Sequence, residues 1–323
     1  MKKIVLIVLI CIWILLPFYI QYQSVKNFSF SEEKIVTIEE GDTFYSLPEK
    51  FWISGFFFKL YLRLSPPTFT LQKWTYKIEA WKNLPEIINW LKKPISNDLN
   101  VTILEGRNIY DIDTKLTSLR LIKSGDFSKS TLSDFQQDFT FLKSARSLEG
   151  FLYPDTYSIN PNNFSVSGFI KQMLINFNYK VIKKEYDLSS KEWLQIIKYA
   201  SIVEKEEKAV SEKPTVAWIL KKRVAQGWMI GADATVCYPY KLTFDECTPS
   251  FIVEHIADKN KYNTRTMAWL PETPISNPSF ETIDSVIHSQ DSDFFFYLHD
   301  SSGNIHYART NEEHVQNKNL YLK

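Results

Sequence analysis

The chain has 323 residues and a nearly balanced charge, with 38 Lys and Arg against 37 Asp and Glu. This balance argues against a nucleic-acid-binding protein, because such proteins present strongly basic faces. The length suggests about two domains. Aromatic residues make up 15% of the chain, and their faces suit stacking on sugar rings, although most such residues are ordinary core residues.

The amino terminus carries Lys2 and Lys3, followed by an apolar run over 4–20. The run is at the short end of what a membrane-spanning helix needs. A cleaved signal peptide is the alternative, but no small-residue cleavage site follows. The two lysines place residues 1–3 in the cytoplasm, because positive charge favours that side. We therefore expect a single-pass anchor in the cytoplasmic membrane, a linker over 21–33, and the remainder of the chain outside the cytoplasm.

One local layout occurs three times between residues 35 and 116. Each copy has a short β-rich run, a tight turn and a helical stretch, and the copies read I-V-T-I-E-E-G-D, Y-K-I-E-A-W-K-N and V-T-I-L-E-G-R-N. Such repetition predicts small α+β modules rather than one long fold. The modules resemble the LysM-like fold, a glycan-binding scaffold in many wall proteins. We place one module at 34–98, and a second with a connector at 99–147.

The character of the chain changes at residue 148. A stretch dense in aromatic residues comes first, and three helical patterns and two strand-like runs follow it, at about 164–184, 190–207, 211–226, 294–298 and 304–307. Helix-rich and then strand-rich segments predict a mixed α+β domain over 148–323.

The helical pattern at 190–207 carries a carboxylate within its apolar stripe. Glu204 follows the apolar Ala200 by four residues and so shares its face. Burial would disfavour the charged form of Glu204 and raise its pKa. Such a residue can be a catalytic acid or a member of a buried ion pair, unless the helix end simply reaches solvent. Lys205 and Glu206 are expected on the solvent side.

Cys237 and Cys247 lie ten residues apart with turn signals nearby, and an oxidising compartment would allow them to form a disulfide. Two unpaired thiols fit the sequence equally well. Cys11 lies inside the apolar run and acts as a small hydrophobic residue. The spacing of His and Cys residues supports no metal site.

Five stretches of the second half resemble motifs of the endolytic murein transglycosylase family, which is also called YceG-like. They are, in order, L-E-G-F-L-Y-P-D-T-Y (148–157), Y-A-S-I-V-E-K-E-E (199–207), G-A-D-A-T-V-C-Y (231–238), Y-N-T-R (262–265) and L-P-E-T-P-I-S-N-P (270–278). The chain departs from the family pattern at Ala234, where proline is usual, and at Glu272 and Thr273, which replace Pro-Gly. The resemblance covers 148–323 well and 35–116 less specifically.

The resemblance implies non-hydrolytic cleavage of the β-1,4 bond between N-acetylmuramic acid and N-acetylglucosamine in nascent glycan strands. This reaction ends elongation and leaves a 1,6-anhydro ring on the muramic acid. The resemblance also implies that Glu204 is the catalytic acid. Because the C6 hydroxyl of the sugar attacks in place of water, one carboxyl can give a proton and then take one, whereas ordinary hydrolysis uses two carboxylates. That double role needs a pKa raised toward neutrality.

Five further residues in the motif loops are candidates for substrate binding: Glu149, Asp233, Tyr262, Asn263 and Thr264. The two acids can orient the sugar or the catalytic glutamate, or they can brace the fold. The hydroxyl and amide groups of the other three suit recognition of N-acetyl groups and hydroxyls. A turn stabilised by Asn263 is the alternative. No cofactor is expected.

The leading hypothesis is therefore a membrane-anchored lytic transglycosylase that acts on peptidoglycan, with peptidoglycan synthases as candidate partners. A non-catalytic peptidoglycan-binding scaffold is one alternative, and Glu204 in the apolar stripe argues against it. A muramidase-type hydrolase is another, and it requires a second acid at a suitable distance.

Overall fold

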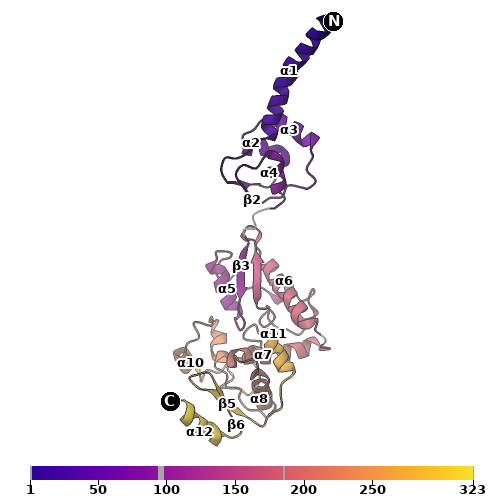
Figure 1. Cartoon of the computed structure of the whole chain (residues 1–323). Coiled ribbons are helices and arrows are strands. Elements are labelled where there is room, and N and C mark those ends of the chain that lie inside the picture. Colours follow the sequence, from indigo (N-terminus) through magenta and orange to yellow (C-terminus); the bar gives the residue numbers. More distant parts are fainter. Residues whose placement is uncertain (1, 94–97, 185, 323) are drawn as a thin grey trace. The chain divides into compact units, whose positions relative to one another are not determined.

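The computed structural model describes residues 2–93, 98–184 and 186–322, apart from the side chains of residues 2–12, 14 and 162. The chain divides into two compact units, Met1–Asn97 and Asp98–Lys323 (Figure 1). Each unit has a hydrophobic core of its own. The mixed α+β class expected from the sequence is confirmed.

The first unit begins with helix α1 (Lys2–Lys26) and contains a two-stranded antiparallel sheet, in which Val36 of β1 lies opposite Tyr76 of β2. Its further elements follow in chain order: β1 (Lys34–Thr37), η1 (Phe44–Ser46), α2 (Leu47–Phe51), α3 (Gly55–Leu64), β2 (Thr75–Ile78) and α4 (Leu84–Trp90). Helix α4 begins at a capping box between Asn83 and Glu86, which satisfies the free amides of its first turn. Two of the three repeated strand–turn–helix copies therefore share one sheet.

The amino-terminal helix differs in part from the expectation. Within the described part of the chain, no helix is long and apolar enough to cross a membrane. Most side chains of the predicted span 4–20 lie outside that part, so the anchor stays a prediction. The linker expected at 21–33 is wrong, because α1 continues to Lys26 and Val25 packs into the core of the first unit. Phe28 and Phe30 pack against the same core, so apolar residues among the polar ones fix this segment.

The second unit opens with a sheet that joins distant parts of the sequence. Strand β3 (Leu99–Ile103) pairs antiparallel with β4 (Asp155–Ile159), and Val101 lies opposite Tyr157. Helix α5 (Ile109–Ser118) follows β3 and is capped by Asn108. The sequence places a boundary between 99–147 and 148–323, but both stretches belong to one unit and one core. The strand of the expected small module finds its partner in the expected catalytic domain, so neither forms the sheet alone.

The remaining elements include the three predicted helical regions and both strand-like runs. The helical regions appear as α6 with η5, as α7 and as α8, and the strand-like runs appear as β5 and β6, which pair antiparallel. In chain order the elements are η2 (Leu132–Asp134), η3 (Thr140–Leu142), η4 (Pro161–Asn163), α6 (Val166–Phe177), η5 (Asn178–Ile182), α7 (Ser190–Glu206), α8 (Lys213–Ala225), α9 (Ala234–Cys237), η6 (Tyr238–Tyr240), α10 (Pro249–His255), α11 (Phe280–Ile287), β5 (Phe296–His299), β6 (Ile305–Ala308) and α12 (Asn311–Tyr321).

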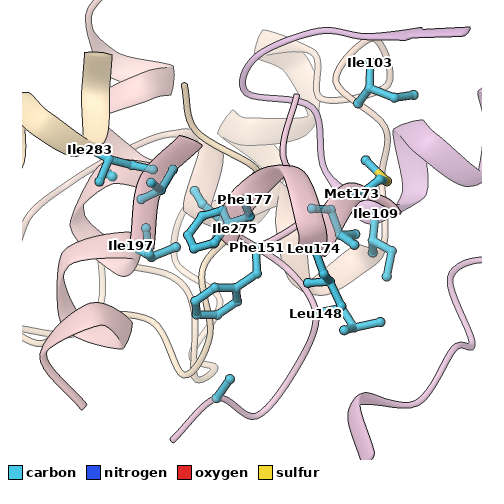
Figure 2. Close-up of a cluster of buried hydrophobic side chains, with 14 of the residues drawn as sticks. Ile103, Ile109, Leu148, Phe151, Met173, Leu174, Phe177, Ile197, Ile275 and Ile283 are labelled. Atoms are coloured by element: carbon cyan, nitrogen blue, oxygen red, sulfur yellow. The ribbon is translucent and has the colours of Figure 1, made fainter. Parts of the chain in front are cut away.

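Helix α7 runs through the core of this unit and packs against α8 and α11. Figure 2 shows Ile197 of α7 in a cluster of buried side chains with Phe151 and Ile283. The loop before β4 lies so close to α7 that a Cβ atom at position 150 would be only 2.5 Å from the side chain of Ile197. The backbone of Gly150 also has φ +90°, which favours glycine. This packing fixes the end of α7, where Glu204, Lys205 and Glu206 follow one another.

Candidate active site

Glu204 takes part in a buried ion pair. Its Oε1 lies 3.0 Å from Nζ of Lys213 on α8, and both side chains are buried, with 10% and 5% exposed. Its Oε2 accepts hydrogen bonds from the backbone nitrogen and the hydroxyl of Ser279, at 2.8 and 2.7 Å, and from the hydroxyl of Thr282. Both oxygens are therefore engaged by α8 and α11.

These partners set the charge of Glu204. Burial alone would raise the pKa of its carboxyl, but the hydrogen bond from Thr282, the Lys213 charge and the bonds from Ser279 together hold the pKa below its ordinary value. The raised pKa expected from the apolar stripe is therefore wrong, and the buried ion pair, the alternative left open by the sequence, is what the structure contains. The spacing of apolar residues within α7 does not indicate that Lys213 of the next helix lies beside Glu204.

Glu206 was expected in water on the solvent side of α7, and the structure instead places it partly buried at the wall of a cleft. Its Oε2 accepts a hydrogen bond of 2.9 Å from the hydroxyl of Tyr297 on β5, which covers this face of the helix end. Burial raises the pKa of the Glu206 carboxyl, and the negative charge of Asp233 adds to the rise. Tyr297, Arg265 and His299 oppose it without cancelling it. Glu206 thus has the protonation behaviour that the sequence assigned to Glu204.

Glu206 lines a cleft of about 910 Å³. Trp228 and Trp269 also line it, with 44% and 63% of their surface exposed. The Arg223 guanidinium is fixed at its wall by the backbone carbonyls of Phe295 and Ile230, at 2.8 and 2.7 Å. Partly exposed indoles beside a partly buried carboxyl form a site that can contact sugar rings and transfer a proton between them.

Asp233 lines the same cleft as Glu206, so the structure brings this predicted site residue to the site. Its Oδ1 accepts a hydrogen bond of 2.7 Å from Nε of Arg265, and both side chains are partly exposed. The pair places a second carboxylate and a second guanidinium in the cleft with Glu206.

Glu149 lies inside the fold and away from solvent. Its side chain has no exposed surface, and it accepts hydrogen bonds from the backbone of Ile109, the hydroxyl of Tyr238 and the amide of Asn277 at 2.9, 3.1 and 2.7 Å. Burial raises the pKa of this carboxyl to about 8. Asn277 also bonds the backbone of Arg107, so this group ties together three distant stretches. Bracing the fold is the role that these contacts support for Glu149.

The residues of the Y-N-T-R motif mainly hold their own loop together. Asn263 is fully buried, and its amide donates to the carbonyls of Ile256 and Asp258 at 3.1 and 2.8 Å. Thr264 is also fully buried, and its hydroxyl accepts a hydrogen bond from the Ala232 backbone. This arrangement matches the alternative of a turn stabilised by Asn263.

Tyr262 belongs to the same motif and is partly buried. Its ring lies 5.0 Å from that of Tyr238, and its hydroxyl lies 3.3 Å from that of Thr273. The structure therefore leaves Arg265, which the sequence did not single out, as the motif residue that lines the cleft.

The neighbours of Glu206 complete the end of α7. Lys205, expected in water, lies under Phe244 with its Nζ 4.2 Å from the ring centroid, and burial lowers its pKa to about 8. Glu207 is 3% exposed, and its Oε2 lies 2.9 Å from Nε2 of His299. The last turn of the helix is therefore partly covered by protein, and Glu206 borders the cleft.

Cys237 and Cys247 form a disulfide with a Cα–Cα distance of 5.6 Å, which confirms that they are close enough to bridge. The bond ties α9 to the loop that carries Phe244. In the described part of the chain, no group of three or more His, Cys, Asp or Glu side chains is arranged to hold a metal ion.

Several residues of the site escaped the sequence analysis: Glu206, Tyr297, Arg223, Trp228, Trp269 and Lys213. One available signal was the aromatic run F-F-F-Y-L, which contains Tyr297. Nothing in one sequence indicates which helix this run contacts.

Comparisons with known proteins identify the family of the chain. The family model of the YceG-like family matches residues 36–320. The chain belongs to this family. An endolytic murein transglycosylase of Bacillus subtilis (strain 168) is 24% identical over 237 residues, covering 69% of this chain and 65% of that protein. One of Streptococcus pneumoniae (strain R6) is 24% identical over 300 residues, covering 81% and 53%. The chain thus spans between about half and two thirds of the length of these relatives.

A solved structure shares the fold. The crystal structure of a YceG-like protein from Listeria monocytogenes aligns with a TM-score of 0.59 at 21% identity, covering 88% of this chain and 99% of that one. At this identity the likeness concerns the fold alone.

Proposed function

We propose that the chain is an endolytic murein transglycosylase, and that Glu206 rather than Glu204 is its acid and base. The observation that carries the proposal is a carboxyl of raised pKa in a cleft with two exposed indoles. Glu204 is held as an anion by Lys213, and a carboxylate fixed in that state is a poor proton donor. The names of the relatives support the same reaction class.

The proposed reaction needs only one carboxyl. Tyr297 donates to Oε2 of Glu206, so Oε1 is the oxygen that is left to carry and transfer a proton. This proton passes to the bridging oxygen as the bond between that oxygen and C1 of the muramic acid breaks. The C6 hydroxyl of the same sugar then bonds to C1 and returns its proton to the Glu206 carboxylate. No water is consumed, and the acid is restored for the next cut.

A muramidase-type hydrolase is the second candidate, and Asp233 is the observation that favours it. This carboxylate lines the same cleft, and its charge contributes to the raised pKa of Glu206. Hydrolysis uses such a second carboxylate to activate water or to attack C1. Asp233 already accepts a hydrogen bond from Arg265 on its Oδ1, and this engagement favours the transglycosylase.

The finer features expected from the sequence belong to the same proposal. We propose that residues 4–20 anchor the chain in the cytoplasmic membrane, with the second unit outside, where the disulfide would be stable. In the first unit, helices follow β1 and precede β2 along the chain, and the two β-strands pair antiparallel. We propose this unit as a LysM-like module that binds peptidoglycan glycan chains. Peptidoglycan synthases, which supply nascent strands, remain candidate partners.

Product analysis tests the function directly. The full-length chain in detergent is incubated with purified peptidoglycan, and the soluble products are identified by mass spectrometry, with Glu206→Gln as the control. Anhydro-ended fragments support the transglycosylase. Fragments with reducing ends would instead indicate that the chain is a hydrolase. Binding of peptidoglycan without release of any fragment would indicate a non-catalytic scaffold.

A further inference from the structure

A second cleft adjoins the proposed active site, and its charged lining is mostly cationic. It has a volume of about 580 Å³, and Trp269 lines both clefts. Its charged residues are four cations and one carboxylate: Arg146, Lys191, Lys198 and Lys261, against Glu272. Four positive charges and one negative charge leave a net charge of +3. We refer to this as the basic cleft.

The single carboxylate is already shared by two of these cations. Oε1 of Glu272 lies 2.9 Å from Nη1 of Arg146 and 3.1 Å from Nζ of Lys261. Neither Lys191 nor Lys198 has a carboxylate partner in the part of the chain that the structure describes. Lys198 is half-buried, and its Nζ donates no hydrogen bond to described residues. Burial and the Arg146 charge lower the pKa of Lys198, and the Glu272 charge opposes them without cancelling them. A half-buried cation without a close ion-pair contact is costly, and a bound anion would offset the cost.

We propose that the basic cleft binds carboxylates of the peptide carried by the muramic acid beside the cut site, so that the chain selects peptide-bearing strands over bare glycan. This inference rests on the proposed function. A glycan strand that lies against Glu206 and stacks on Trp269 continues from there into the basic cleft. Its N-acetyl and hydroxyl groups are neutral and gain little from four cations. The peptide joined to its lactyl group supplies carboxylates, which form charge-assisted hydrogen bonds with Lys and Arg.

The test measures binding in the Glu206→Gln chain, which separates recognition from cleavage. Dissociation constants are obtained by calorimetry for soluble glycan fragments that carry peptides, and for the same fragments after an amidase has removed the peptides and the lactyl carboxylates it exposes have been capped as neutral methylamides. The parent chain should bind the peptide-bearing fragments more tightly. Adding Lys191→Met and Lys198→Met should weaken that binding by roughly threefold to tenfold, in line with two partly exposed ion pairs. Binding of stripped fragments should not change, and the difference should shrink in high salt.

Lys183→Met is the matched control, because Lys183 is an exposed lysine outside the basic cleft, and it should leave both constants unchanged. Equal affinity of the parent chain for both fragment types would overturn the proposal, as would an equal loss for both in the double variant. Lysine-dependent binding of stripped strands that carry phosphate polymers would assign the cleft to phosphate instead. If the wild-type chain cuts nothing yet shows the lysine-dependent preference, only the proposed activity fails.

Discussion

Two glutamates that lie two residues apart at the end of α7 have electrostatic environments that shift their pKa values in opposite directions. Successive helical residues turn by ~100°, so Glu204 and Glu206 point to different neighbours. Lys213 and two hydroxyls stabilise the charge of the first, whereas burial and Asp233 disfavour the charge of the second. The pKa of the same type of side chain is thus shifted in opposite directions within one turn, because the two environments differ.

Glu206→Gln should remove activity without unfolding the protein. The amide keeps the size of the side chain and can still accept from Tyr297, but it neither gives nor takes the proton. We expect a loss of kcat at or beyond the upper end of the ~10²–10⁴-fold typical of acid–base catalysis. Release of anhydro-muropeptides is the measurement, and circular dichroism checks the fold. Near-normal release would exclude Glu206 from the chemistry.

Glu204→Gln should behave differently, because it leaves the buried Lys213 cation without its anion. Breaking a buried pair from one side typically costs ~3–5 kcal/mol in the free energy of unfolding. Chemical denaturation measures this cost. Adding Lys213→Met should recover part of the stability, since no unpaired charge then remains. A Glu204→Gln protein of normal stability that is inactive would return the catalytic role to Glu204.

Stability should fall as the pH rises, because of Glu149. Its pKa is raised from 4.5 in the unfolded chain to about 8 in the fold, so the stabilising contribution is complete below about 4.5 and is lost as the pH rises toward 8. The total is a few kcal/mol for a shift of this size. Glu206 adds in the same direction. Denaturation between pH 4.5 and 8.5 measures the effect, and a flat profile would contradict the burial of Glu149.

At the scale of elements, the sequence predicts most helices and strands of the second unit, because the amphipathic pattern of a helix such as α7 is local. The same pattern fails for Glu206, whose cover comes from Tyr297, 91 residues further along the chain. It fails for Glu204 because the hidden partner, Lys213, lies on another helix. The motif resemblance indicates Glu204, whereas the cleft favours Glu206, the carboxyl that we propose as the acid and base.

The disulfide between Cys237 and Cys247 should stabilise the wall that carries Phe244. The bond closes a loop across ten positions, and removing such a cross-link should lower the free energy of unfolding by about 2–3 kcal/mol. Thermal unfolding of a double Cys→Ser variant measures this. In the native protein, a thiol reagent should label neither cysteine until a reductant is added. Ready labelling without reductant would contradict the bond.

At the scale of the molecule, the boundary between the two units predicts where the chain can be truncated without unfolding. All residues of the proposed site lie in the second unit, so a fragment of residues 98–323 should fold and cleave soluble glycan fragments. A fragment of residues 148–323, the domain expected from the sequence, should not fold, because β4 loses β3 and the core loses Val101 and Ile103. Solubility and a cooperative thermal transition distinguish the two. A folded 148–323 fragment would contradict the shared core.

The contacts of Asn277 have a consequence for the timing of folding. This side chain joins Arg107 and Glu149, which precede it by 170 and 128 positions, and Tyr297 reaches Glu206 from still further along. Contacts between such distant residues form slowly, because the intervening chain must first be ordered. A chain emerging from its amino terminus can complete the first unit early, but it cannot assemble the Glu206 cleft until β5 exists. We therefore expect that a chain truncated before β5 lacks the complete Glu206 cleft and cleaves no glycan fragment.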